Sequence, residues 1–232
     1  MNDKVEAFVL SQSDYKDNDL LLQVISKEYG HLSLVGKSAK KISSKNHFLV
    51  MCIYEFIIDY KFGKTIYSIH GSRLLNNYFE DNDIELITIK NIICELTLKN
   101  KEIDLYDALV FVFDHFNKDN AYLLLCMFLS YLIKRFGITP VVDACAICGK
   151  KEVISFSNNA GGFLCKDHIN GQEIMSIDTL KKIRLIIKGE LKDFEILKQF
   201  DYSYNDFVIL MEFFIHNSDI RINSYDLLKQ IH

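Results

Sequence analysis

The spacing of the hydrophobic residues changes once along the chain, and this change separates two kinds of predicted structure. Before residue 73 they recur mainly at every second position, as in His31-Leu32-Ser33-Leu34-Val35, which is the period of a half-buried strand. After Arg73 they recur every three or four positions, which is the period of an amphipathic helix. We therefore predict an α+β protein, with a domain of strands at 1–78 and a helical domain at 79–232.

The strand-forming part of the sequence is short and is divided by tight turns. The segment Lys61-Phe62-Gly63-Lys64 is a hairpin turn signal between two runs that are rich in strand-forming residues. Five strands in about 70 residues suggest a small closed barrel, and the OB-fold is the commonest barrel of this size and strand count. The expected strands are 5–10, 20–26, 31–35, 48–60 and 65–70.

The helical part is expected to begin near residue 74, where Leu74, Leu75, Tyr78 and Phe79 have the spacing of a first helix. Later segments repeat this spacing as far as residue 230. Glycines interrupt it at about 141–172, which we expect to be an insertion of a different kind. The further helices are expected at 83–98, 104–116, 120–137, 176–188, 195–200, 204–217 and 223–230.

The most apolar stretch, 121–133, is interpreted as a buried helix. As a helix it spans about 20 Å, whereas the hydrocarbon core of a bilayer is about 30 Å thick. Asn120 can cap the start of this helix and Gly137 can end it. We therefore expect no membrane-spanning segment and no membrane partner.

Composition narrows the class of protein. Of the 232 residues, 49% are hydrophobic and 25% are charged, which is ordinary for a globular protein with a sizeable core. The net charge of −4 argues against nucleic acid covering the whole surface, but it allows a local basic patch. The segment Met1 to Leu10 contains charged residues and has no secretory signal, so we expect a reducing cytoplasmic compartment without disulfides.

The six cysteines fall into two groups. Cys52, Cys94 and Cys126 lie in apolar contexts, where a free cysteine behaves as a small core residue. The other three join one histidine in a pattern of CxxC followed by glycine and then, after sixteen intervening residues, CxxH. The four residues of this pattern are Cys145, Cys148, Cys165 and His168.

This pattern predicts one structural zinc ion in a zinc ribbon at about 141–172. A CxxC pair can grip a tetrahedral ion from a tight turn, and a closed Cys₃His set is typical of a structural rather than a catalytic ion. Two alternatives remain: core cysteines that bind no metal, and a thioredoxin-like redox pair. The redox pair requires CxxC at the start of a helix that follows a strand, and Asp143 to Cys148 lacks this context.

No motif indicates catalysis, and we expect the protein not to be an enzyme. Gly63-Lys64-Thr65 resembles the end of a P-loop, but that motif needs a glycine where Ile58 stands and a strand that leads into a helix. The HxE and PCxxC segments of zinc deaminases are absent, as are GxGxxG and GxSxG. The carboxylates are spread evenly, so no acid pair stands out.

A basic segment follows the third expected strand directly. Residues 36–45 contain four lysines and no acid, and on an OB barrel such a loop borders the face that binds single strands. Lysines there would neutralise phosphates without reading bases; the alternative is a solvated loop. The lysines are Lys37, Lys40, Lys41 and Lys45. Aromatic residues that offer either stacking surfaces or barrel core are Tyr29, Tyr54, Tyr60, Phe62 and Tyr67.

Four segments, taken in order, carry a resemblance to a known family, and together they extend over most of the chain. They are 6–22, 27–41, 136–149 and 156–165. These segments resemble RecO, a family of bacterial recombination mediators. The first resembles the family's opening strands, the second its third strand and basic loop, and the last two its zinc region.

The resemblance implies an N-terminal OB-fold, then a helical domain with an inserted zinc ribbon, in a cytoplasmic, nucleoid-associated bacterial protein of DNA repair and recombination after DNA damage. It implies binding of single- and double-stranded DNA and annealing of complementary strands. With the partner RecR, such proteins help RecA to displace the single-strand DNA-binding protein. The DNA contacts that it implies are Lys37, Lys40, Lys41 and Lys45, to which Arg73 is added for its charge.

The sequence departs from the family at two points. Many relatives have cysteine at the fourth ligand position, where this chain has His168, and arginines are frequent where the basic loop here has lysines. Lysine lacks the bidentate fork of arginine and grips phosphate as a point charge. Two other classes of function stay open, a zinc-ribbon scaffold that binds only protein partners and a metal-dependent hydrolase with an open ligand position.

Overall fold

The computed structural model describes residues 3–41, 44, 47–79 and 82–232. The chain packs as two compact units, of which one joins Met1–Phe113 to Ile222–His232 and the other is Asp114–Arg221. These units are defined by packing, whereas the predicted domains 1–78 and 79–232 are defined by the kind of secondary structure, so that boundary stays a prediction. In the described part of the chain, no helix combines the length and the apolar character needed to cross a membrane.

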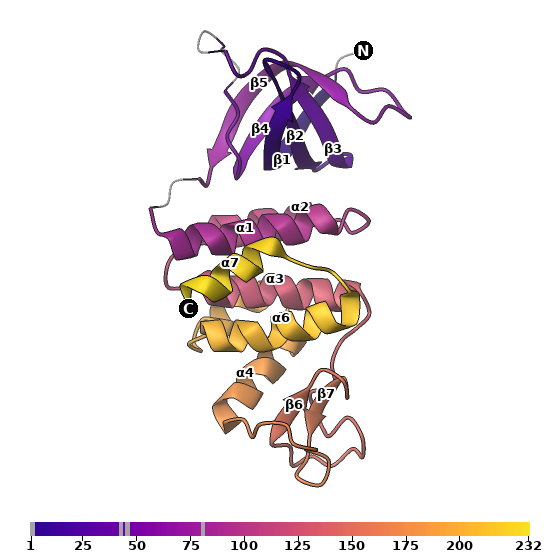
Figure 1. Ribbon diagram of the computed structural model, residues 1–232, viewed down its shortest axis with the longest axis vertical. Coiled ribbons are helices and arrows are strands. Elements are labelled where there is room, and N and C mark those ends of the chain that lie inside the picture. The colour runs from indigo at the N-terminus through magenta and orange to yellow at the C-terminus, as the bar shows by residue number, and fades with distance from the viewer. Residues whose placement is uncertain (1–2, 42–43, 45–46, 80–81) are drawn as a thin grey trace. The chain divides into compact units, whose positions relative to one another are not determined.

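The first unit contains a closed barrel of strands (Figure 1). Its members are β1 (Asp3–Tyr15), β2 (Asp19–Ser26), β3 (Gly30–Gly36), β4 (Cys52–Ile58) and β5 (Tyr67–Asn77). The strand order is β1-β2-β3-β5-β4, and β4 pairs with β1 to close the barrel. Neighbouring strands are antiparallel except β3 and β5, which run parallel with Leu34 opposite Tyr67 and Val35 opposite Ser68. This OB-like arrangement confirms the barrel that the sequence predicted.

The barrel wall is buried on both faces where helices of the same unit cover it. Val5 and Val9 of β1 are fully buried in the barrel interior. Phe8 points to the opposite face of the strand and is also fully buried, because its ring centroid lies 4.8 Å from that of Phe113 and 6.0 Å from that of Tyr78. A strand that is buried on both faces loses the clean alternation of polar and apolar residues.

The helix predicted from residue 74 is wrong, because β5 continues through this segment to Asn77. β5 pairs with β4 along its length and ends with Asn77 opposite Cys52. Leu74 is 48% exposed, so the apolar spacing that includes Leu75, Tyr78 and Phe79 does not mark a buried helical face. Pairing with β4 therefore overrides the local helical spacing, and the predicted strand 65–70 is too short.

Three helices complete the first unit: α1 (Ile84–Lys99), α2 (Tyr106–His115), which leads out of the unit, and α7 (Asn223–Ile231). They confirm the helices predicted in these regions. The side chain of Asp83 caps α1 by accepting a 2.9 Å hydrogen bond from the backbone N–H of Glu85. α7 packs along α1 although the two are far apart in the sequence.

Glu95 of α1 supplies the cap for α7. The residue before α7 is Ile222, whose side chain offers no hydrogen bond. Instead, the Glu95 carboxylate accepts hydrogen bonds from the backbone N–H of Asn223 at 2.9 Å and of Ser224 at 2.8 Å, and from the Ser224 hydroxyl at 2.9 Å. Desolvation raises the pKa of Glu95, but these bonds and that from Lys99 outweigh it, so the pKa lies below its ordinary value.

The second unit consists of helices and one small hairpin. Its elements are α3 (Ala121–Arg135), β6 (Ser155–Ser157), β7 (Gly162–Leu164), α4 (Ile177–Lys188), the 3₁₀ turn η1 (Leu191–Asp193), α5 (Phe194–Leu197) and α6 (Tyr204–Ser218). α3 is buried almost all round, with α4 and α6 packed against it. This confirms that the most apolar stretch of the sequence is a core helix.

The predicted side-chain cap of α3 needs a correction. Asn120 has helical backbone angles (φ −107°, ψ −5°), and its side chain makes no capping hydrogen bond. Its Nδ2 donates backwards to the carbonyl of His115 at 3.3 Å. The side-chain oxygen of Asn117 instead accepts from the backbone N–H groups of Asp119 and Asn120. Gly137 ends this region with the left-handed φ of +71° that the sequence predicted for a helix end.

We expect Glu95→Gln to destabilise the protein at neutral pH by about 1–2 kcal/mol, since a neutral amide loses the charge-assisted cap of α7. The folded pKa of Glu95 is below the ordinary 4.5, so the carboxylate's contribution is complete above that value and is lost as the pH falls through the folded pKa. Urea unfolding at neutral and at acid pH measures this difference. The exposed Glu102→Gln is the control, and an equal effect of Glu95→Gln at both pH values would contradict the capping role.

Candidate metal centre and nucleic-acid interface

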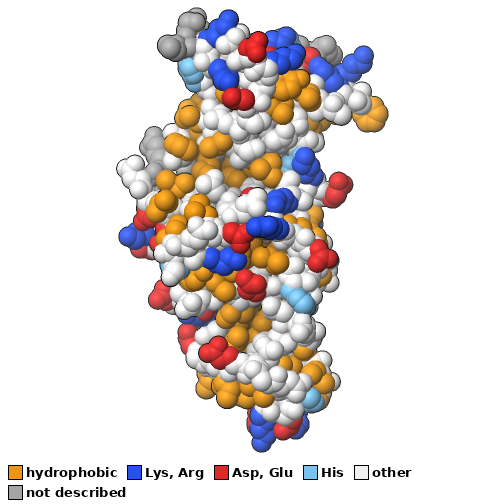
Figure 2. All heavy atoms as spheres, in the orientation of Figure 1, with side chains coloured by type: hydrophobic (Ala, Val, Ile, Leu, Met, Phe, Trp, Pro, Cys, Tyr) orange, Lys and Arg blue, Asp and Glu red, His pale blue; other side chains and the backbone are white. Residues whose placement is uncertain are grey.

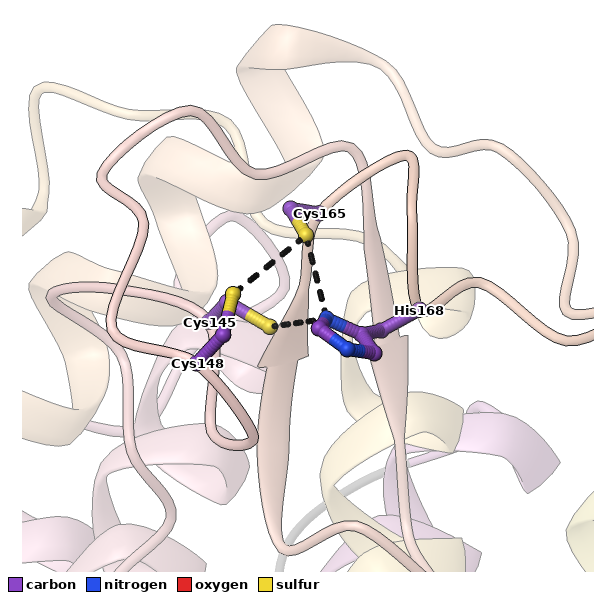
Figure 3. Close-up of side chains that lie close together, drawn as sticks. All are labelled: Cys145, Cys148, Cys165 and His168. Atoms are coloured by element: carbon purple, nitrogen blue, oxygen red, sulfur yellow. Dashed lines mark hydrogen bonds between the residues drawn. The ribbon is translucent and has the colours of Figure 1, made fainter.

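Four side chains meet beside the β6–β7 hairpin of the second unit, as Figure 3 shows. Their ligand atoms all lie within 4.8 Å of one another. The Nδ1 of His168 lies 3.4 Å from the Sγ of Cys165 and 3.6 Å from that of Cys145, and the Sγ atoms of Cys148 and Cys165 are 3.7 Å apart. His168 therefore turns toward the thiols, although cysteine is frequent at its position in the family that the sequence resembles.

These separations match the edges of one coordination tetrahedron. With Zn–S bonds of about 2.3 Å and Zn–N bonds of about 2.0–2.1 Å, a tetrahedron has edges of about 3.8 Å between two sulfurs and about 3.6 Å between sulfur and nitrogen. The observed values are 3.7 Å for the sulfur pair and 3.4 and 3.6 Å for the two sulfur–nitrogen pairs. The cluster can therefore hold one metal ion.

Each pair of ligands is carried by a tight turn. In the first, the backbone N–H of Gly149 donates to the carbonyl of Cys145 at 2.9 Å, and Gly149 has the left-handed φ of +74° that this turn requires. In the second, the backbone N–H of His168 donates to the carbonyl of Cys165 at 3.0 Å. The sequence thus folds both pairs in the same way and points both toward one centre.

The electrostatic surroundings of Cys145 and Cys148 favour the binding of a cation at the first turn. Desolvation raises the pKa of the Cys145 thiol, but hydrogen bonds from backbone N–H groups, including those of Cys165 and Cys148, outweigh it and bring the pKa to about 6. At Cys148 a backbone hydrogen bond from Lys150 lowers the pKa of the thiol. Desolvation and the neighbouring thiols raise it by more, so the pKa lies above its ordinary value. The thiols repel one another as they ionise, and a bound cation would relieve this repulsion.

The base of the hairpin is tied to the rest of the second unit. The carboxylate of Asp143 forms ion pairs of 2.7 Å with both Arg184 and Lys188 of α4. Nearer the ligands, Lys150 of the first turn pairs with Asp167 of the second. The sequence did not predict these ion pairs, because nothing in the spacing of charged residues shows which of them meet.

A close backbone approach also fixes the hairpin. Val141 forms a parallel bridge with Gly162, and the N–H of Phe163 donates to the carbonyl of Val141 at 2.9 Å. A Cβ at Gly162 would lie 2.3 Å from the Val141 carbonyl oxygen, a distance that requires the backbone to shift. Only glycine fits at this position, whereas a Cβ at the preceding Gly161 would meet open space.

The basic loop after β3 folds back onto the turn between β1 and β2. The backbone N–H of Ser38 donates to Oδ1 of Asp19 at 2.8 Å, and that of Lys40 donates to the carbonyl of Asn18 at 3.1 Å. Ala39 is buried and anchors the loop. Residues 37–41 of this loop therefore form an ordered surface rather than a loose tether.

The predicted DNA contacts in this loop differ in their ion pairing, and one of them is not described by the structure. Lys37, Lys40 and Lys41 are exposed, and they lie together. The Nζ of Lys40 makes a 2.7 Å ion pair with Asp14, which offsets part of its charge. Lys45 lies outside the described residues.

Arg73 is not part of this loop. It lies on β5 with its side chain 70% exposed, and its register partner on β4 is Glu55. The Nε of Arg73 lies 3.6 Å from the Glu55 carboxylate, which Lys4 also approaches to 3.6 Å. These three residues form a mixed patch whose net charge is no larger than that of Arg73 alone.

The five aromatic candidates divide by burial. Tyr54 and Tyr67 are about as buried as the rest of the barrel core, at 5% exposure each. Tyr60 is half-buried against the barrel core, Tyr29 is 38% exposed, and Phe62 is 94% exposed at the hairpin turn between β4 and β5. The sequence alone did not separate these cases, although Phe62 stands next to the turn residue Gly63, where a side chain has little to pack against.

We expect Gly162→Ala to disrupt the hairpin, because the added methyl group collides with the backbone of Val141. Gly161→Ala should cost only about 1 kcal/mol, since it strains a positive φ but meets no atoms. Thermal unfolding of both variants measures the difference. Equal stability of the two variants would show that the Val141–Gly162 approach does not constrain the hairpin.

Two family models match the chain in succession. The model described as Recombination protein O N terminal matches residues 1–78, and that described as Recombination protein O C terminal matches residues 81–199. The second covers the ligand cluster, and the first covers the barrel with its basic loop. These matches confirm the family that the ordered segments of the sequence resemble.

Several proteins named DNA repair protein RecO are similar to this chain over most of their length. The DNA repair protein RecO of Caldanaerobacter subterraneus subsp. tengcongensis is 32% identical over 177 residues, which cover 71% of this chain and 70% of that protein. Those of Mesoplasma florum and a Thermoanaerobacter species are 29% and 28% identical over 182 and 210 residues. They cover 73% and 84% of this chain, and 68% and 84% of their own length. The chain belongs to the recombination protein O family of DNA repair proteins.

Proposed function

We propose that this protein is a DNA-binding recombination mediator that does not catalyse a reaction. It binds single- and double-stranded DNA, anneals complementary strands and, with RecR, assists the loading of RecA onto strands covered by the single-strand DNA-binding protein. The single observation that carries this proposal is an OB-like barrel with an ordered, exposed lysine loop (residues 37–41) at the end of β3, in a chain of the recombination protein O family.

The lysine loop supports contact with phosphates rather than with base edges. Lys37 and Lys41 are exposed and lie in a loop held by backbone hydrogen bonds, so their charges need little ordering to meet a DNA strand. Lysine neutralises phosphates as a point charge and releases counterions, which makes binding depend on salt but not on sequence. Sequence-independent binding is what a protein that anneals any two complementary strands requires.

We also propose that Cys145, Cys148, Cys165 and His168 bind one structural zinc ion. Three thiolates and an imidazole are a common zinc set, and the tetrahedral separations of these atoms support it. When bound, zinc would hold the two turns together. Four protein ligands fill the tetrahedron, so this reading assigns the ion no catalytic step.

The proposal extends to organisation and place. The barrel of residues 1–78 would supply the DNA contacts, and residues 79–232 would carry the zinc ribbon on a helical scaffold. Both would act in the bacterial cytoplasm on the nucleoid. A scaffold that binds only protein partners is the competing function, and it predicts no salt-sensitive binding to single strands.

Reduced, purified protein should contain about one zinc ion per chain by elemental analysis, as a closed Cys₃His site requires. Cys148→Ser should lower this content, because it removes one ligand of the cluster. Cys94→Ala is the matched control, since Cys94 is buried in α1 and is not among the four clustered side chains. Wild-type protein without stoichiometric zinc would overturn the metal assignment but not the DNA-binding one.

Reversal of two loop charges in Lys37→Glu/Lys41→Glu should weaken binding to single-stranded DNA at least about tenfold at low salt and reduce the salt dependence of binding. Annealing of complementary oligonucleotides should slow in parallel. Lys40→Gln should have a smaller effect, because it removes one charge that is already paired with Asp14 and reverses none. Fluorescence anisotropy at two salt concentrations measures the affinities.

The control for this experiment changes the net charge equally at lysines outside the barrel. Lys118→Glu/Lys151→Glu alters two exposed lysines of the second unit and should leave DNA binding nearly unchanged. Equal loss in both double variants would show that the net charge, rather than the loop, governs binding. Absence of salt-sensitive binding in the wild-type protein would favour the protein-only scaffold.

A further inference from the structure

The loop between β4 and β5 projects from the barrel (Figure 1), and its turn carries the aromatic residue Phe62. Phe62 is 94% exposed, more than any other large hydrophobic side chain in the described part of the chain. A single exposed hydrophobic residue needs no explanation by itself. Phe62, however, lies in an ordered turn beside a lysine and a group of stacked tyrosines.

The loop is held in one shape. The carboxylate of Asp59 accepts a 2.6 Å hydrogen bond from the backbone N–H of Ser68 and pairs with the Nζ of Lys64 at 2.6 Å. The hydroxyl of Tyr67 donates to the carbonyl of Lys64 at 2.6 Å. Gly63 has a left-handed φ of +82° at the turn. Phe62 is therefore presented to solvent by an ordered turn.

Three tyrosines form a pile of nearly parallel rings at the base of this loop. The ring centroids of Tyr60 and Tyr67 lie 5.1 Å apart with planes 16° from parallel, and those of Tyr29 and Tyr60 lie 4.0 Å apart with planes 17° from parallel. Tyr67 is the buried end of the pile, whereas Tyr29 is 38% exposed and is held by a hydrogen bond from its hydroxyl to Asp3. The pile thus runs from the barrel core to the surface.

The positive charge in this loop favours an anionic ligand that also contains planar aromatic rings. Lys61 is exposed, and no acid among the described residues pairs with it. Proteins bind single strands by combining aromatic side chains, on which bases stack, with cations that meet the backbone, and the loop between the fourth and fifth strands is one of the loops that OB-folds use. A protein partner would match the exposed Phe62, but it would not require the neighbouring ordered cation and tyrosine pile.

We propose that the β4–β5 loop stacks an unpaired nucleobase on Phe62, with Lys61 at the adjoining phosphate. This inference rests on the proposed DNA binding and adds a contact that the lysine loop cannot make. β3 begins beside Tyr29 at Gly30 and ends at Gly36 before the lysine loop, so one strand of about 4–16 nucleotides, the span of an OB-fold, would engage both. Duplex DNA, whose bases are paired and stacked, gains nothing from Phe62.

The test compares Phe62→Ala with Phe62→Trp in the full-length protein. Phe62→Ala should weaken binding to an oligothymidylate of about 16 nucleotides about fivefold or more, whereas Phe62→Trp should retain it. The salt dependence should stay unchanged in Phe62→Ala, because no phosphate contact is lost. Ile177→Ala removes another highly exposed hydrophobic side chain, 86% exposed on α4, and should have no effect.

Two further probes separate stacking from other roles. An abasic strand of the same length should bind wild-type protein and Phe62→Ala equally, and so should duplex DNA. Equal binding of the oligothymidylate by wild-type and Phe62→Ala would overturn the inference while leaving DNA binding by the lysine loop intact. Loss of binding to a protein partner with unchanged binding to the strand would likewise overturn it. Failure of the wild-type protein to bind any strand would overturn the proposed function itself.

Discussion

The parallel pairing of β3 with β5 is the contact on which the first unit depends. All other strand pairs of the barrel are antiparallel, and without this one the strands would form an open sheet with two free edges. The contact is short, with Leu34 opposite Tyr67 and Val35 opposite Ser68. Leu34 and Tyr67 both lie in the barrel core, so closure and core formation are the same event. It also fixes where the lysine loop leaves β3 and where the β4–β5 loop enters β5.

The barrel of the first unit and the hairpin of the second unit bury their hydrophobic residues in different ways. The barrel encloses its own hydrophobic residues, and α1 and α2 bury part of its outer wall. The hairpin of the second unit packs through Phe156 against Phe213 of α6, whereas around the candidate ligands it has a small separate cluster, formed by Cys145, Leu164 and Cys165 with Val153 and Ala160 against it. So few apolar side chains give little stability alone, which is the situation in which a bound ion contributes directly to folding. Two of these core residues are also candidate ligands, so the core and the metal centre form together.

Local patterns made the barrel, the core helix and the clustering of the three cysteines with His168 predictable. The period of two, the Gly63 turn and the paired CxxC and CxxH are each complete within a few neighbouring residues. The predictions are wrong or incomplete where a residue distant in the sequence determines the local structure. β4 draws the segment around Leu74 into β5 against its helical spacing, and Glu95, more than a hundred residues away in sequence, replaces a local cap on α7. Likewise, Asp14 beside Lys40 and Glu55 beside Arg73 are tertiary neighbours that no spacing rule reveals.

The position of α7 has a consequence for the newly made chain. The first unit needs residues 222–232, yet the whole of the second unit, residues 114–221, is synthesised in between. At about 5–20 residues per second, the ribosome needs roughly 5–20 s to cross that interval. During this time the surface of α1 that α7 will cover stays bare, and the barrel must persist without its last helix.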